Sequence, residues 1–485
     1  MAQVARGSGR TRSAAWAGFA AGSAALAAAL LLRLVTGIPS LFELIGEAIT
    51  FVLPVAVFDS LLGIFGPIAK PLMIVAVAIG AVGTAAGLGA ASARIGRTTK
   101  RATAIAAAGG VLGTSGIPLL FAAPGTALIG LPVAALYAWR FWAGWDPSAH
   151  EDPDADLTRR HLLQWAAVFG VVALAGIGLW RLLSGGRREV AGALPQPITP
   201  NEQFYVISKN LIDPAVDVMA YRLTVGGMVA TPQSLTMNDL RAMAAVDQVQ
   251  TLECISNEVG GHLISTAAWR GVRLRDVLEH AAPTSSTVEL KLTSEDGYTE
   301  SIPLEMAADD RVLLAYDMNA QPLPQRHGFP LRLLLPGVYG MKGPKWLTRI
   351  EAIDAPYDGY WEQRGWTKEA YLKTMSRIDT PASAPSYPSG RPITLSGIAF
   401  ASFRGITKVE LRIGSEDRWV EATLDSPFAD GAWRFWRHEW TPDRAGSYPV
   451  NVRATDGEGT LQEARLAPTL PDGASGYDGT SYTVG

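Results

Sequence analysis

Cys254 is the only cysteine among the 485 residues of the chain, and it lies where an apolar run gives way to a polar loop. The loop continues through Asn257 to the glycine pair Gly260 and Gly261. A lone thiol has no intrachain disulfide partner, so it can fill a core, act as a nucleophile or bind a soft metal. The glycines would let the backbone approach a bulky ligand closely. The loop by itself leaves these roles open.

A second group of reactive residues lies in the segment 327–347, which is rich in glycine and proline. Its glycines permit turns that aim backbone amides at an anion, and its basic side chains can neutralise a phosphate. The basic residues are His327, Arg332, Lys342 and Lys345. Together with the thiol, they predict a metal-cofactor oxidoreductase with an anionic cofactor.

The composition divides the chain. A length of 485 residues exceeds what one hydrophobic core holds, so two or three units are expected. Ala, Gly, Leu, Val and Ile dominate residues 14–183, whereas the rest has the composition of a soluble protein. The formal net charge of -3 gives no electrostatic reason to expect a nucleic-acid partner.

The first third predicts a bundle of five or six transmembrane helices, because about 20 apolar residues can cross a bilayer. Frequent Gly and Ala favour close helix packing there. The candidate spans are 14–32, 41–62, 71–91, 102–121, 125–142 and 162–182.

Two features predict the orientation of this bundle. The basic loop 94–101 favours the cytoplasmic side. Arg159 and Arg160, directly before the last span, resemble a twin-arginine export signal, which serves proteins exported in the folded state. The alternative is a pair of ordinary stop-transfer arginines. Both interpretations place the soluble part on the periplasmic or extracellular side of a multi-pass protein of the cell membrane.

The soluble part begins with a linker at 184–198. An α+β domain follows, with strands expected at 221–225, 288–292 and 331–335 and helices at 236–244 and 274–280. Short alternating strands from 390 to 468 predict an immunoglobulin-like β-sandwich, and the residues after 471 are expected to form a loop.

Six stretches of the soluble part occur in the order found in the sulfite oxidase family of molybdenum enzymes, which the chain resembles over residues 195–375. They are Thr199–Val206, the Cys254 loop, Trp269–Leu274, Asp296–Tyr298, His327–Arg332 and Lys345–Leu347. The last domain also resembles the family's dimerisation domain, so whether a homodimer forms is left open. The predicted domains are a transmembrane bundle (1–183), a linker (184–198), a molybdopterin-binding catalytic domain (199–378), and an immunoglobulin-like domain with its tail (379–485).

The resemblance implies a molybdenum–molybdopterin cofactor with one pyranopterin dithiolene, in which Cys254 is the protein's ligand to the metal. It implies that the substrate gains or loses oxygen at molybdenum, while the protein positions and polarises the reactants. The predicted catalytic residues are Cys254, Asn257 and Trp366. The predicted cofactor-binding residues are Asn201, Phe204, Tyr205, Cys254, Asp296, His327, Arg332, Lys342 and Lys345.

The chain departs from the family at the substrate pocket. Arginines of sulfite oxidases proper are replaced by Ile207 and by Glu258 with Val259, and the active-site tyrosine is replaced by Trp366. Such a pocket should bind the sulfite dianion poorly. The expected substrate is therefore a small, neutral oxide such as a sulfoxide.

The electron donor or acceptor is expected to be a quinone, a membrane redox protein or a soluble carrier. No histidine lies within an apolar run, and one cysteine cannot hold an iron–sulfur cluster, so neither a membrane haem nor such a cluster is expected in this sequence.

Two alternatives remain. Glu43, Glu47 and Asp59 in an apolar stretch would suit a membrane transport or sensor protein with the outer domain as a scaffold. Trp366 in place of the tyrosine would suit a catalytically silent cofactor-binding protein.

Overall fold

The computed structural model describes residues 14–29, 69–95, 108, 133–139, 193–210, 213–382, 386–415 and 417–485. The chain forms two compact units. One consists of residues 1–184 with 208–212, and the other of residues 185–207 with 213–485.

The described part of the first unit is helical. Helix α4 (Ala69–Ile95) covers one predicted span, and residues 14–29 and 133–139 are helical within two others. Among the residues described, no helix is both long enough and apolar enough to cross a bilayer. The predicted transmembrane bundle therefore stays a prediction. The carboxylates of the transport or sensor alternative (Glu43, Glu47 and Asp59) and the arginines of the orientation signal (Arg159 and Arg160) lie outside the described ranges.

Small residues bring the helices of this unit together. A Cβ atom at Gly18 would lie 2.5 Å from the carbonyl oxygen of Ala85, and one at Gly22 would lie 2.5 Å from the Ala85 Cβ. The Tyr137 hydroxyl donates a hydrogen bond to the same carbonyl at 3.0 Å. The predicted close packing through Gly and Ala is thus observed between residues 14–29 and α4.

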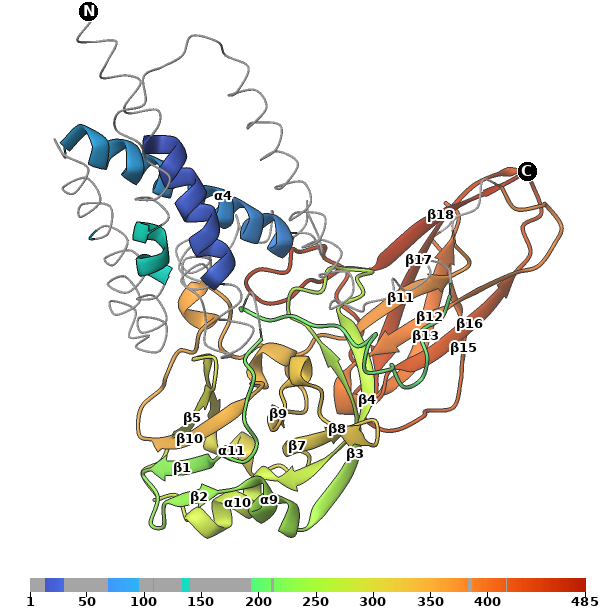
Figure 1. Ribbon diagram of the computed structural model, residues 1–485. Coiled ribbons are helices and arrows are strands. Elements are labelled where there is room, and N and C mark those ends of the chain that lie inside the picture. Colours follow the sequence, from blue (N-terminus) through green and yellow to red (C-terminus); the bar gives the residue numbers. More distant parts are fainter. Residues whose placement is uncertain are drawn as a thin grey trace, which may run out of the picture. The chain divides into compact units, whose positions relative to one another are not determined.

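The second unit begins with two β-sheets (Figure 1). The first has the order β2 (Gln233–Leu235), β1 (Leu223–Gly227), β10 (Leu347–Ile353), β5 (Glu289–Ser294) and β6 (Thr299–Pro303). The second has the order β3 (Ala245–Glu253), β4 (Ile264–Arg273), β7 (Leu313–Met318) and β8 (Gln321–Pro322), with β9 (Arg332–Leu334) paired to β7.

Three short helices, α9 (Met237–Ala242), α10 (Leu274–Ala281) and α11 (Leu304–Ala307), complete the domain. Thr236 caps α9 by a capping box with Asp239, in which each side chain bonds the other residue's backbone amide. The apolar face of α10 packs into the same core as β1, β5, β9 and β10. The predicted α+β class is confirmed. Helices α9 and α10 lie close to the predicted ranges 236–244 and 274–280.

Two four-stranded antiparallel sheets form the C-terminal sandwich (Figure 1). One has the order β11 (Met375–Thr380), β12 (Ile393–Phe400), β16 (Arg434–Trp440) and β15 (Thr423–Leu424). The other has the order β14 (Trp419–Glu421), β13 (Ile406–Ile413), β17 (Gly446–Asp456) and β18 (Asp478–Val484). One core lies between them and includes Leu395, Leu411, Trp436 and Val452.

The structure changes two predictions for this domain. The tail was expected to be a loop, but β18 pairs with β17 along its whole length, so that prediction was wrong. Only Tyr482 and Val484 of β18 are buried, and its Gly, Ser and Thr residues concealed the strand pattern. The expected domain boundary after residue 378 falls inside β11, whose residues pair with β12 from Met375 onward.

Candidate functional site

Cys254 begins the connection between the antiparallel strands β3 and β4 and is 7% exposed. Its amide donates to the Leu263 carbonyl at 2.9 Å, and its own carbonyl accepts from the Asn257 amide at 2.9 Å. These bonds close residues 254–263, which we call the Cys254 loop. The thiol is therefore fixed at the end of a β-hairpin.

Asn257 braces this loop from within. Its Oδ1 accepts from the Leu263 amide at 2.9 Å, and its Nδ2 donates to Glu253 Oε1 at 2.9 Å. A Cβ atom at Gly261 would lie 2.5 Å from that Oδ1, so only glycine fits there without displacing it. The structure shows Asn257 shaping the loop, and its catalytic role stays a prediction.

Glu253, which the sequence analysis did not select, is a buried carboxyl directly before the thiol. Its second oxygen, Oε2, is buried and accepts no hydrogen bond within the described part of the chain. Burial raises the pKa of Glu253 to about 7, although the Asn257 bond and the Arg377 charge each lower it. Glu253 could have been selected from the sequence because it is an acidic residue at the end of a strand-like run, directly before the thiol.

His327 ends the short 3-10 helix η3 (Gln325–His327) and is neutral. Its Nε2 donates to the Asn201 carbonyl at 2.8 Å, which assigns the ring proton to that nitrogen. Burial lowers the pKa of His327 to about 3, and the charges of Arg332, Lys345 and Arg326 lower it as well. The ring also meets Phe204 edge-on at 5.4 Å. His327 therefore lies inside a cluster of positive charge.

Arg332 is a buried cation of this cluster. Its side chain is buried in β9, its Nη1 donates to the His327 carbonyl at 3.2 Å, and its guanidinium lies 5.2 Å from the centre of the Trp269 ring. The buried Nε has no hydrogen-bond partner, and no carboxylate pairs with Arg332, among the residues described. Burial lowers its pKa to about 10. A buried cation of this kind favours the binding of an anion.

Gly328 permits a second cation beside Arg332. Its φ of +115° lies in a region that side chains rarely adopt, and a Cβ atom there would be 3.0 Å from Lys345 Cβ and 3.1 Å from Arg332 Cβ. The Lys345 ammonium donates to the carbonyls of Ile207 and Arg326, each at 3.1 Å. The turn thus brings Arg332 and Lys345 together.

Tyr205 connects the positive cluster with the thiol. Burial, the largest cause, raises the pKa of its phenol, and the charge of Cys254 adds to this while that of Arg332 opposes it. A Cβ atom at Gly340 would lie 2.8 Å from the Tyr205 hydroxyl and 3.4 Å from the Glu253 carbonyl oxygen. The Tyr205 ring stacks on Phe204 at 5.5 Å. The structure therefore brings the predicted Cys254, Phe204, Tyr205, Asn201, His327, Arg332 and Lys345 into one group.

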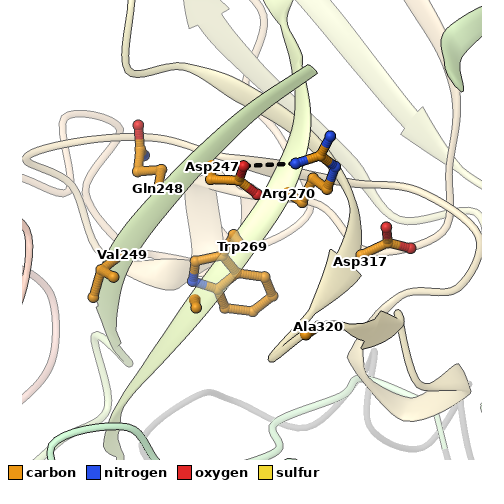
Figure 2. Close-up of a pocket in the computed structure, with 8 residues that line it drawn as sticks. Asp247, Gln248, Val249, Trp269, Arg270, Asp317 and Ala320 are labelled. Atoms are coloured by element: carbon orange, nitrogen blue, oxygen red, sulfur yellow. Dashed lines mark hydrogen bonds and ion pairs between the residues drawn. The ribbon is translucent and has the colours of Figure 1, made fainter. Parts of the chain in front are cut away.

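A separate cavity of about 460 Å³ shares only Trp269 with the surroundings of this group. It is lined by residues of β3, β4 and the β7–β8 turn, and Figure 2 shows the Asp247–Arg270 ion pair above the Trp269 indole. The edge of the Phe204 ring meets the same indole at 5.7 Å. Trp269 therefore borders both the cavity and the Arg332 guanidinium.

The other predicted residues have different surroundings. Lys342 is buried and paired with Glu300 at 2.5 Å and Glu362 at 2.9 Å, so its charge is compensated within the protein, and its predicted role in cofactor binding stays a prediction. Asp296 accepts from the Tyr298 amide at 3.0 Å in the β5–β6 turn. Trp366 is buried just after the 3-10 helix η5 (Glu362–Arg364). The predicted roles of Asp296 and Trp366 stay predictions.

Comparison with known proteins relates this part of the chain to a family of oxidoreductases. Residues 210–361 match the family model described as "Oxidoreductase molybdopterin binding domain". Human mitochondrial sulfite oxidase is 32% identical over 320 residues, covering 56% of this chain and 58% of that protein. The NADH nitrate reductase of Hordeum vulgare is 28% identical over 332 residues, covering 56% of this chain and 36% of that protein. The chain thus spans little more than half of the human relative.

A solved structure agrees in fold. The sulfane dehydrogenase SoxCD from Paracoccus pantotrophus superposes with a TM-score of 0.53 at 21% identity, covering 60% of this chain and 85% of that chain. This likeness concerns the fold alone, whereas the match of residues 210–361 relates that part of the chain to molybdopterin-binding oxidoreductases. Residues 210–361 are therefore similar to the molybdopterin-binding domain that the family model describes, and the chain resembles sulfite oxidases over 56% of its length.

The described residues fit this cofactor. The buried Arg332, whose charge no carboxylate balances among the residues described, suits an anionic phosphate, and the loop-held thiol suits a soft metal. Arg332, Lys345, His327 and Asn201 would hold the pterin and its phosphate.

Replacing Arg332 by Met should separate cofactor binding from stability. We expect cofactor content to fall at least about tenfold, because a hydrogen bond to a charged group contributes about 1.5–3 kcal/mol. The apo-protein should lose less than about 1 kcal/mol of unfolding free energy, since an uncompensated buried charge is removed. Molybdenum and pterin analysis, with urea unfolding of apo-protein, measures both. Arg241→Met, which removes a surface partner of Asp317, is the control and should keep full cofactor. Full loading of Arg332→Met would contradict the assignment.

His327 should cause part of the acid sensitivity of the apo-protein. Its folded pKa of about 3 lies below the unfolded value near 6.5, so acid favours the unfolded state, which takes up the proton. Between pH 7 and pH 5 we expect this residue to remove about 2 kcal/mol of unfolding free energy, a loss that His327→Gln should abolish. Urea titrations at the two pH values measure it. The exposed His280→Gln should keep the wild-type loss, and an unchanged loss in His327→Gln would refute the prediction.

Proposed function

We propose that the chain is a membrane-anchored molybdenum-cofactor oxidoreductase. It transfers an oxygen atom to or from a small, neutral oxide substrate on the outer side of the cell membrane. The observation that carries the proposal is the close grouping of the buried Arg332, the neutral His327 and the Cys254 loop. A lone thiol beside a buried, uncompensated cation suits a metal held by an anionic organic cofactor.

The bound cofactor supplies two-electron oxygen-atom chemistry at its metal. Reduction of an oxide consumes two electrons and two protons and releases the reduced substrate and water, so electron and proton supply are both required. Cys254 would provide the thiolate ligand. Tyr205, whose pKa is raised mainly by burial, stays protonated at neutral pH and can donate a hydrogen bond to an anionic group in the site.

The charge around the Cys254 loop supports a neutral substrate. Glu258 of this loop is exposed, and Ile207, which is 40% exposed, adds no charge where relatives are expected to have arginine. An acidic side chain disfavours a dianion such as sulfite. A sulfoxide or an N-oxide carries its polar oxygen without net charge and avoids this repulsion.

The membrane anchor and the location are supported by the sequence of the first unit. Residues 14–183 are predominantly apolar, and the described helices there pack through Gly18 and Gly22 as membrane helices do. The basic loop 94–101 and the Arg159–Arg160 pair favour the cytoplasmic side, which leaves the catalytic domain outside. A quinone, a membrane redox protein or a soluble carrier would exchange the electrons.

The metal assignment is tested by Cys254→Ser. We expect about one molybdenum per chain in the wild type, and in the variant a retained pterin with an altered metal spectrum, because Arg332 and Lys345 still hold the phosphate. Metal analysis, pterin analysis and electron paramagnetic resonance of the reduced protein provide the measurements. Wild-type protein without molybdenum, purified from a host that makes the cofactor, would refute the enzyme proposal.

Substrate class is tested on the loaded enzyme with a reduced dye as electron donor. Neutral S-oxides and N-oxides should be reduced at least about tenfold faster than sulfite is oxidised with a matching acceptor dye, equivalent to about 1.4 kcal/mol of transition-state preference. Glu258→Gln should increase any sulfite activity by reducing repulsion. Rapid sulfite oxidation by the wild type would rule out the neutral-oxide proposal.

A further inference from the structure

The sandwich domain reaches the Cys254 loop through Arg377 of β11. The side chain of Arg377 is 2% exposed, and its Nη1 donates to the Gly261 carbonyl at 2.6 Å. Its Nε donates to Asp379 at 2.7 Å, and the Asp379 side chain is 3% exposed. One buried ion pair of the sandwich thus supplies a charge-assisted hydrogen bond to the loop that carries the thiol.

A second sandwich residue meets the neighbouring position of the loop. Gly260 has a φ of +74°, and a Cβ atom there would lie 2.5 Å from Asp478 Oδ1. The other oxygen of Asp478 accepts from the Ile378 amide at 2.8 Å, so β18 and β11 are joined beside the loop. Two successive glycines are therefore in close contact with two sandwich side chains.

The inner side of the loop is braced by Asn257, as described above. Arg377 is also close enough to Glu253 for its positive charge to lower the pKa of that carboxyl. The Cys254 loop is consequently tied to Glu253 through Asn257 and to Arg377 through the Gly261 carbonyl.

A direct role of Arg377 in substrate binding does not fit these contacts. The side chain is almost fully buried, and its charge is compensated by Asp379. A substrate would need exposed donors, whereas Nη1 and Nε of Arg377 already bond to protein oxygens. The geometry suits a residue that acts through the loop.

We propose that Arg377 is a positioning residue of the molybdenum site, supplied by the sandwich domain to fix the Cys254 loop. The proposal rests on the proposed function only in taking Cys254 as the metal ligand. Order in the loop can be measured without the metal, so the two proposals can fail separately.

The experiment uses the full chain, purified without cofactor. Arg377→Met with Asp379→Asn removes the donor and its partner together, which avoids an unpaired buried charge. Hydrogen exchange of amides in residues 254–263 and iodoacetamide labelling of Cys254, the only thiol, report on the loop. We expect both rates to rise about tenfold or more, as loss of a charge-assisted bond predicts, while amides of β12 stay protected.

The matched control is Arg453→Met with Glu410→Gln, an ion pair at 3.0 Å between β17 and β13 of the same sandwich. It should leave the loop rates at the wild-type level. If the Arg377 double variant does not fold, Arg377→Lys, which keeps the charge but loses the second donor, should give a smaller rise in the same measurements. Wild-type rates in the folded Arg377 variant, or an equal rise in the control, would overturn the proposal.

The molybdenum content of the loaded variants separates this proposal from the proposed function. A looser loop with an altered metal spectrum supports both. A looser loop in a chain that never binds molybdenum supports the loop-fixing role and refutes the proposed function. An unchanged loop in protein loaded with molybdenum refutes the loop-fixing role and supports the proposed function.

Discussion

The positive charge of the buried Arg332 is the constraint on which the rest of the site depends. Among the residues described, no carboxylate pairs with it, and its guanidinium lies over the Trp269 ring. The neighbouring elements increase this positive potential, because His327 is kept neutral and the turn at Gly328 adds Lys345. Without an anion this arrangement would oppose folding, since a buried charge loses its hydration. An anionic group bound beside Arg332 would therefore stabilise the protein as well as serving the proposed chemistry.

Local patterns in the sequence selected the candidate residues with reactive or charged side chains. Cys254 was found because it is the only thiol, and the segment from His327 to Lys345 because its glycines and cations are close in sequence. Lys342 shows the limit of this reasoning: a basic residue in the same segment pairs with Glu300 and Glu362 from other elements. Which of several nearby cations stays uncompensated depends on long-range packing, and the sequence does not give it.

Long-range packing also limited the prediction of the fold. Strands and helices with clear apolar alternation, such as β5 and α10, were predicted close to their observed bounds. β18 was missed because its pairing with β17, rather than its own composition, makes it a strand. Arg377 was missed for a related reason, since it lies 116 residues from its partner Gly261. Contacts between domains follow from how the sheets pack, which no local window of residues contains.

The position of β18 in the chain bears on when the site can form during synthesis. Asp478 stands at the start of this strand and contacts Gly260, which belongs to the Cys254 loop. A ribosome makes residues 478–484 after it has made the thiol, so the contact of Asp478 with Gly260 can form only after β18 has been synthesised. The last strand of the chain thus completes the surroundings of a loop made more than 200 residues earlier.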